Sequence, residues 1–332
     1  MSVDSYQDMI LQDAVPTTTI QHDISVFLKD AFVEIWRNYN IDPPLGILLD
    51  YNWPGEKVLE VLVDISVLLF IVTATVYRFI NDSYDPQEQL DTVLKFQGTG
   101  YLEQMEQTYL PVLTQLSMKL RESRAREKLY QDFQIIVGSI VTLAEPLSVM
   151  SLAAILPFSS DTIARHLHPL RSVLQVPDDL KTPVRTLHLS FREFLLSDKV
   201  QHQPFGVDGP ATHLMLWTRC LQFLSAQNSL HENICGLRYP GELRKEIDPA
   251  IIGRHLPPAF QYACRYWVHH LQHSMVRIHD EDEVHMFLQK HFLHWVEALS
   301  LMNRISEVIG QLGILQSLMS VSSTQPRILQ RG

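Results

Sequence analysis

The chain has 332 residues, 46% of them hydrophobic and 19% charged, a composition typical of a folded globular protein and not of a disordered segment. Its net charge of −10 argues against general nucleic-acid binding, which requires a basic face. The cysteines Cys220, Cys235 and Cys264 lack the spacing of a zinc or disulfide framework, so a reducing compartment and a cytoplasmic location are expected.

Residues 1–124 are predicted to consist of a poorly structured N-terminal segment followed by a helical domain. Residues 1–22 show no clear periodicity and no basic segment followed by an apolar run, so no signal peptide is expected. Asp23 is predicted to cap a helix that reaches Asn38, because apolar residues recur there with helical spacing. The helical domain, residues 23–124, is completed by helices expected at 53–80, with one break near Ser66, and at 86–96 and 101–120.

One segment imitates a membrane span. Residues 65–77 (ISVLLFIVTATVY) are almost entirely apolar, and Asp64 and Arg78 bracket them. A spanning helix needs about 20 such residues, whereas a run of about 10–14 is more often a buried helix. A buried helix, and no membrane as a partner, is therefore predicted.

Residues 125–200 are predicted to form a winged-helix domain. Two short apolar runs, 173–176 and 184–187, are separated by Pro177, Asp178 and Asp179, and this pattern is typical of a β-hairpin. Helices are expected before the hairpin and a closing helix after it, which is the element order of a winged helix. The helices before the hairpin are predicted at 125–144 and 146–156 and from Ser160 onward.

His188 lies where the second predicted strand meets the closing helix. Ser190 is predicted to be the N-cap of that helix, with Glu193 completing a capping box. Such a junction offers free backbone N–H groups that suit an anion, whereas the alternative is a structural histidine in a turn. The apolar face of the helix is predicted to consist of Phe191, Phe194 and Leu195.

Residues 201–332 are predicted to form a second helical domain. Loops are expected at 203–210 and 236–258, where glycine and proline gather. The fold class is thus mainly α: a helical bundle, a winged-helix domain with a short β-hairpin and a second helical domain. Helices of the last domain are expected at 212–224, 258–273, 283–293 and 296–319.

Several kinds of chemistry lack support in the sequence. No glycine is followed by lysine, so the chain has no phosphate-binding P-loop, and no GxSxG motif supports a hydrolase. Asp50 and Asp64 follow apolar runs but are not expected to bind a metal. The helix predicted at 161–171 resembles a DNA recognition helix only in position, because it offers few basic residues in an acidic chain.

Fifteen histidines raise the question of zinc. His269 and His273 have i, i+4 spacing, and His291 and His294 have i, i+3 spacing. Neither pair has a HExxH glutamate or a nearby cysteine pair, so solvated or capping histidines are expected. No catalytic residue and no metal site is predicted.

Three sequence blocks occur in one order over roughly residues 20–320. They are WPGE at 53–56 with LFIVTATVYRFI at 69–80; LHLSFREFL at 187–195; and LPP at 256–258 with YACRYWVHHL at 262–271 and FLHWVEALSL at 292–301. Together they resemble the fungal NACHT-type NTPases of the NLR-like STAND class, which include heterokaryon-incompatibility proteins.

The resemblance implies a place within a longer architecture. In that family a P-loop NTPase core precedes a helical domain, a winged helix and a second helical domain, often followed by a WD-repeat propeller. This chain looks like the part downstream of the core, as a truncated gene model, a degenerate paralogue or a split regulatory fragment. Residues 1–22 would then be a remnant that follows the core.

The resemblance also implies a role for His188. In the family the winged-helix histidine contacts the β-phosphate of bound ADP and holds the inactive state closed, and His188 occupies that position. The Gly-x-Pro motif that contacts the base in many relatives has no counterpart, because the comparable residues 67–70 read VLLF. ADP or ATP is therefore expected only if an NTPase core is supplied, and no cofactor is expected in this chain itself.

Two functions from different classes remain open. The leading expectation is a regulatory and interaction module of a signalling NTPase, not an enzyme by itself, with protein partners or self-association through exposed apolar helices. The alternative is a helical scaffold without a retained switch. A DNA-binding winged helix and a self-sufficient NTPase are less favoured, because the chain is acidic and lacks a P-loop.

Overall fold

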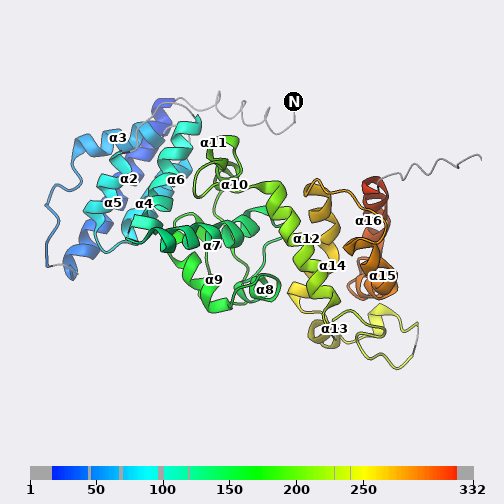
Figure 1. Cartoon of the computed structure of the whole chain (residues 1–332). Helices are drawn as coiled ribbons and strands as arrows, with labels where there is room; N and C mark the ends of the chain where they lie inside the picture. The colour runs from blue at the N-terminus through cyan, green and yellow to red at the C-terminus, as the bar shows by residue number, and fades with distance from the viewer. Residues whose placement is uncertain are drawn as a thin grey trace, which may run out of the picture. The chain divides into compact units, whose positions relative to one another are not determined.

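The computed structural model describes residues 17–43, 46–66, 70–95, 101–118, 120–227, 229–239 and 241–319. These residues are mainly helical, with one small two-stranded sheet among them, which confirms the predicted mainly α fold class (Figure 1). The chain divides into two compact units. The first holds the described residues up to Gln131 with His166–Val176 and Thr186–Phe205, and the second holds Asp132–Arg165, Pro177–Arg185 and the described residues from Gly206 onward.

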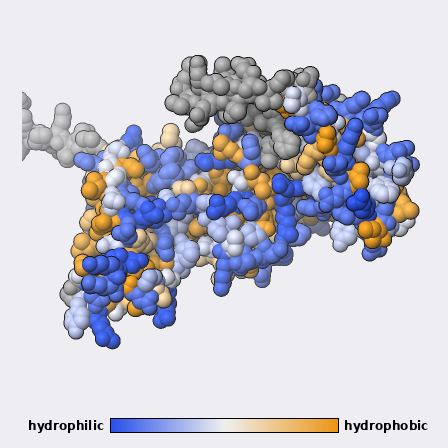
Figure 2. All heavy atoms as spheres, turned by 180° about the vertical axis from the view of Figure 1, so that it is seen from behind, coloured by the Kyte–Doolittle hydropathy of each residue, from blue (hydrophilic) through white to orange (hydrophobic). Residues whose placement is uncertain are grey.

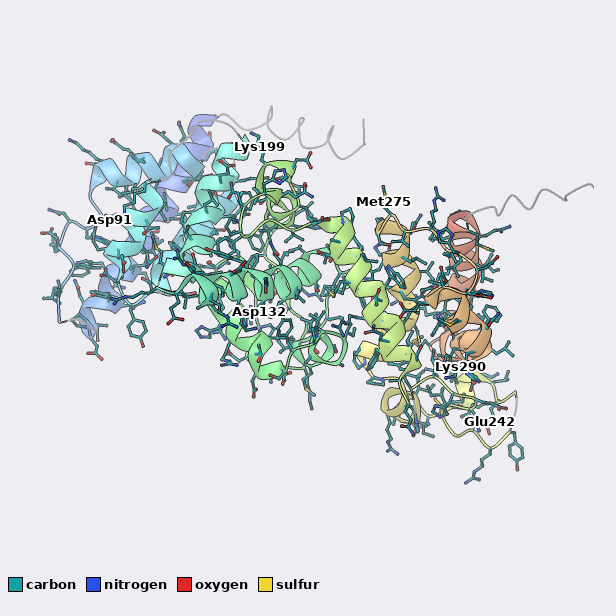
Figure 3. All side chains as sticks on the ribbon, viewed as in Figure 1. Asp91, Asp132, Lys199, Glu242, Met275 and Lys290 are labelled. Atoms are coloured by element: carbon teal, nitrogen blue, oxygen red, sulfur yellow. The ribbon has the colours of Figure 1, made fainter. Side chains whose placement is uncertain are left out.

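Helix α4 is the centre of the first unit. It packs against α2, α3, α5 and α6, and its Val72, Val76 and Ile80 are buried. The described part of the apolar run is therefore largely buried within the unit, as expected for a buried helix. Charged side chains such as Asp91 project outward from the same unit (Figure 3). The helices are α2 (Thr17–Ile41), α3 (Glu56–Ser66), α4 (Phe70–Asn81), α5 (Pro86–Lys95) and α6 (Tyr101–Met118).

Of two predictions about the first unit, one agrees with the structure and the other is wrong. The break near Ser66 agrees with the end of α3, although residues 67–69 lie outside the described residues. The cap predicted at Asp23 is wrong, because α2 already begins at Thr17 and Asp23 is an exposed residue within it. An acidic residue on the solvent-exposed face of a helix costs little stability, so Asp23 does not mark the start of α2. Most of residues 1–22 lie outside the described part.

The segment predicted as a winged helix has the expected order of elements. Its strands have two residues each, shorter than the predicted runs, and α11 was not predicted. The winged-helix assignment and the three-domain division remain predictions. The elements are α7 (Ser123–Thr142), α8 (Val149–Ile155), α9 (Ser160–Leu167), η1 (His168–Leu170), β1 (Leu174–Gln175), β2 (Arg185–Thr186), α10 (Leu189–Leu195) and α11 (Asp198–Gln201).

The second unit is built around α12 and α14, which pack along each other. Both α15 and α16 also contact α14, and Trp267 and Trp295 are fully buried there. The Trp295 indole N–H donates to the carbonyl oxygen of Cys264 at 2.8 Å, which ties α15 to α14. The helices are α12 (Gly209–Ser225), η2 (Arg244–Glu246), α13 (Pro249–His255), α14 (Pro258–His273), α15 (Glu283–Leu301) and α16 (Ile305–Leu318).

Two predictions for the second unit are wrong. The helix break expected at residues 294–295 does not occur, because α15 continues to Leu301 and buried Trp295 belongs to its packed face. The chain turns instead near Asn303, whose φ is 59°. The loop expected at 236–258 contains α13, with the Asp248 carboxylate accepting the Ala250 N–H at 2.9 Å and a proline in the first turn.

All three cysteines are buried free thiols, and burial raises the pKa of Cys220 to about 12. Within the described residues, no helix combines the length and apolarity that crossing a membrane requires.

Candidate functional site

His188 is the N-cap of α10, two residues after strand β2 ends. Its backbone is extended, and its Nδ1 accepts the Ser190 N–H at 3.1 Å. The predicted cap at Ser190 and its capping box with Glu193 are therefore wrong. The imidazole supplies the capping acceptor, and the Ser190 side chain turns into the protein, where the residue is 2% exposed.

Ser190 links the His188 ring to the interior of the first unit. Its Oγ lies 2.7 Å from His188 Nδ1 and 2.6 Å from the Oη of Tyr109 on α6. Because Nδ1 accepts a backbone N–H, the proton of the neutral imidazole is on Nε2. His188 itself is exposed, so Nε2–H is the group of this ring available to donate to a ligand.

The layer beneath His188 is apolar, as predicted. Phe191, Phe194 and Leu195 are fully buried, and the Tyr109 ring packs against both phenylalanines with centroid distances of 5.1 and 5.3 Å. The sequence pattern identified this face correctly. It did not identify Tyr109, which lies 81 residues before Ser190 and has no local signal that connects it to the site.

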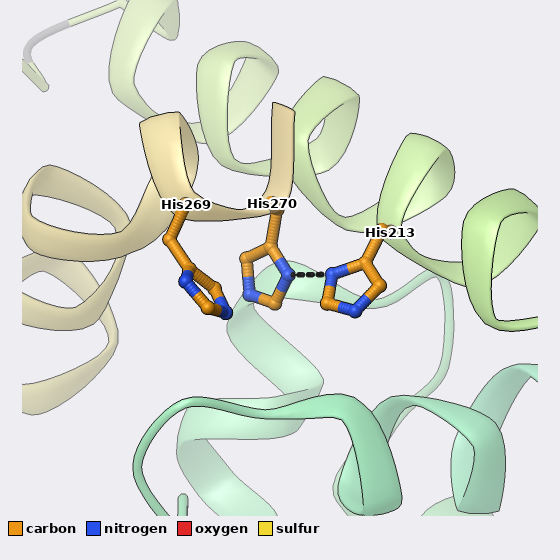
Figure 4. Close-up of side chains that lie close together, drawn as sticks. All are labelled: His213, His269 and His270. Carbon is orange, nitrogen blue, oxygen red and sulfur yellow. Dashed lines mark hydrogen bonds between the residues drawn. The ribbon is translucent and has the colours of Figure 1, made fainter. Parts of the chain in front are cut away.

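The second unit contains a histidine cluster that the sequence spacing identified only in part. Helix α12 brings His213 onto His269 and His270 of α14, and the Nδ1 atoms of His213 and His270 lie 2.7 Å apart (Figure 4). His270 Nε2 lies 2.7 Å from the Tyr262 hydroxyl, which accepts the Ala144 N–H at 3.2 Å.

Burial, and secondarily the neighbouring histidines, lower the pKa of His270 to about 2, so this ring stays neutral. His273, which has i, i+4 spacing with His269, stacks on His213 at 5.1 Å and is exposed. The histidines with i, i+3 spacing, His291 and His294, have Nδ1 atoms 3.4 Å apart, and no third ligand joins them among the described residues.

No protein family model matches the chain, and no solved structure matches it. Among curated proteins, it is similar to the vegetative incompatibility protein HET-E-1 of Podospora anserina, with 28% identity over an alignment of 196 residues. The match covers 46% of this chain and 14% of that protein, so the chain spans a small part of its relative. The three sequence blocks and this match together place the chain in distant, partial relationship to a fungal vegetative incompatibility protein.

Proposed function

We propose that this chain is a regulatory and interaction module of an NLR-like STAND signalling NTPase. The observation that carries the proposal is the exposed His188, in the second of three family blocks that occur in the family order. The partial similarity to a vegetative incompatibility protein supports the same relationship. The chain acts on a NACHT-type nucleotide core and is not an enzyme by itself, because its sequence has no P-loop.

His188 holds the inactive state of the core by donating Nε2–H to the β-phosphate of ADP. Ser190 fixes the ring through Nδ1, so little side-chain freedom is lost when the phosphate is bound. Helix α10 is short, with seven residues, so the imidazole rather than the helix end is the principal donor. One hydrogen bond to a charged phosphate stabilises the closed state by about 1.5–3 kcal/mol.

Exchange of ADP for ATP removes the stabilisation of the closed state by His188 and lets the module move away from the core. The two states then differ in which surfaces are open, and the open state assembles into oligomers. The module also presents an apolar stripe, Ile305, Ile309 and Leu312 on α16, as a surface for a protein partner or a second copy.

A helical scaffold without a switch is the second candidate. The contacts of His188 with Ser190 favour the scaffold, because an N-cap histidine stabilises its helix whether or not nucleotide is bound.

Calorimetry distinguishes the two candidates. The chain is titrated into a separately expressed NACHT core loaded with ADP, and into the same core loaded with a non-hydrolysable ATP analogue. The switch predicts at least about tenfold tighter binding to the ADP-loaded core, a difference of about 1.4 kcal/mol. Equal affinity for both forms, or no binding to either, contradicts the switch and favours the scaffold.

A further inference from the structure

We propose that His213, His269 and His270 form a binding site for one divalent transition-metal ion, with Zn²⁺ the best match. One imidazole nitrogen from each residue lies within 4.8 Å of the other two. The three rings come from two helices, and α12 and α14 are the most closely packed pair in the second unit (Figure 4). The proposal is independent of the nucleotide switch, since it concerns a different unit and different residues.

The donor set suits zinc and related ions. Neutral imidazoles are common zinc ligands, with Zn–N distances of about 2.0–2.1 Å, so nitrogens around a tetrahedral ion are about 3.4 Å apart. The Nδ1 atoms of His213 and His270 are closer than this, at 2.7 Å, because they share a hydrogen bond instead of an ion. Small rotations of the two rings open that pair to ligand spacing.

One arrangement of protons satisfies these hydrogen bonds before a metal binds. In it the Tyr262 oxygen accepts the Ala144 N–H, and its own O–H donates to His270 Nε2. His270 therefore carries its proton on Nδ1 and donates it to His213 Nδ1, so the proton of His213 is on Nε2. His213 Nδ1 already presents a lone pair toward the centre of the cluster.

Metal binding requires a change of tautomer in one ring and no change of charge. The proton of His270 moves from Nδ1 to Nε2, which then donates to the Tyr262 oxygen, and the Tyr262 O–H rotates away from Nε2. The Nδ1 lone pairs of His213 and His270 then both face the ion, and no proton is released by either ring. Tyr262 acts as the outer partner that orients a ligating histidine, as second-layer hydrogen bonds do in metal sites.

The residues around the cluster keep His270 neutral and leave one edge of the cluster accessible to solvent. His270 is fully buried, and burial lowers its pKa, so protons do not compete for it near neutral pH. His269 is half-buried, and the exposed His273 lies beside it with a ring-centroid distance of 4.3 Å. His273 Nδ1 donates to the His269 carbonyl at 2.8 Å, so its Nε2 keeps a lone pair at the exposed edge of the cluster.

The test is titration of the whole, metal-stripped chain with Zn²⁺ by calorimetry. The proposal predicts one ion per chain with a Kd below about 10 μM, and at least about tenfold weaker binding in His213→Gln and in His269→Gln. His255→Gln is the matched control, because His255 is an exposed histidine of the same unit outside the cluster, and it leaves the affinity unchanged.

Two further measurements remove ambiguity. Circular dichroism of each variant verifies that the helices remain, and Co²⁺ added to the wild-type chain reports coordination through its visible absorption without any substitution. The absence of saturable Zn²⁺ binding and of a Co²⁺ spectrum in the wild-type chain overturns the proposal. Binding that persists in both folded glutamine variants overturns it as well.

Discussion

The hydroxyl oxygens of Tyr109 and Ser190 lie 2.6 Å apart, and both residues are 2% exposed. This contact connects α6 to the start of α10 within the first unit, and the same serine oxygen lies 2.7 Å from the ring of His188. An exposed histidine is thereby positioned from the buried side of the protein. The orientation of His188 depends on a residue 81 positions before Ser190.

Ser190→Ala removes the hydroxyl that contacts both Tyr109 and His188. We expect the free energy of unfolding to fall by about 1–2 kcal/mol, because a buried hydrogen bond is lost at a site with no solvent to replace it. Urea denaturation measures the change. Ser225→Ala, at an exposed serine that ends α12, is the control and should have no measurable effect. Equal stability of the two variants would show that the Ser190 contacts contribute nothing.

His270 makes the stability of the chain sensitive to acid. Its folded pKa is about 2 against an ordinary value of 6.5, so the unfolded chain binds one proton more between these values. Stability is therefore complete above about pH 6.5 and falls as the pH drops. Between pH 7 and pH 5, His270→Gln should lose about 2 kcal/mol less than the wild type.

The measurement is urea denaturation of both proteins at the two pH values, with a chelator present to keep metal out of the cluster. Parallel losses of stability would contradict a neutral, buried His270.

Arg265 of α14 connects α16 to the loop that follows α7. Its Nη1 lies 2.9 Å from a Glu145 oxygen, while Nε and Nη2 each lie 3.2 Å from an oxygen of Glu307 in α16. Arg265→Lys keeps the charge but loses this forked geometry, and we expect a cost of about 1 kcal/mol. Thermal unfolding measures it against Arg254→Lys, which changes an exposed arginine of α13. Unfolding midpoints equally close to wild type would refute the structural role.

The α16 stripe is expected to promote self-association. Ile305, Ile309 and Leu312 follow helical i, i+4, i+7 spacing, and Ile309 is 80% exposed. Apolar residues also interrupt the hydrophilic surface in the space-filling view (Figure 2). Ile309→Lys should lower the mean mass in light scattering at tens of micromolar chain. Met286→Lys alters an exposed apolar residue of α15 and should not. A wild-type monomer at this concentration would contradict the expectation.

The sequence predicted local structure better than contacts between distant residues. Helix α14 has the predicted bounds, 258–273, because proline marks its start and the apolar periodicity is regular. The end of α15 was missed because packing of Trp295 against α14, not a local breaker, decides where that helix continues.

The candidate sites likewise combine residues that local sequence signals identify with contacts that only the fold reveals. The residues around His188 mark it as a candidate in the sequence, whereas the contact of Ser190 with Tyr109 is seen only in the fold. His269 and His273 share one helix, so their i, i+4 spacing is visible in the sequence. His213, which lies 57 residues before His270, joins them only because α12 packs along α14.

The rate of ADP release tests the nucleotide switch most directly. A NACHT core loaded with a fluorescent ADP is mixed with the wild-type chain, with His188→Ala, or with His202→Ala, which changes another exposed histidine of the same unit. The wild-type chain and His202→Ala should slow ADP release at least about tenfold, as expected from about 1.5–3 kcal/mol for a hydrogen bond to phosphate. His188→Ala should not slow it. An identical release rate with wild type and His188→Ala would contradict the switch.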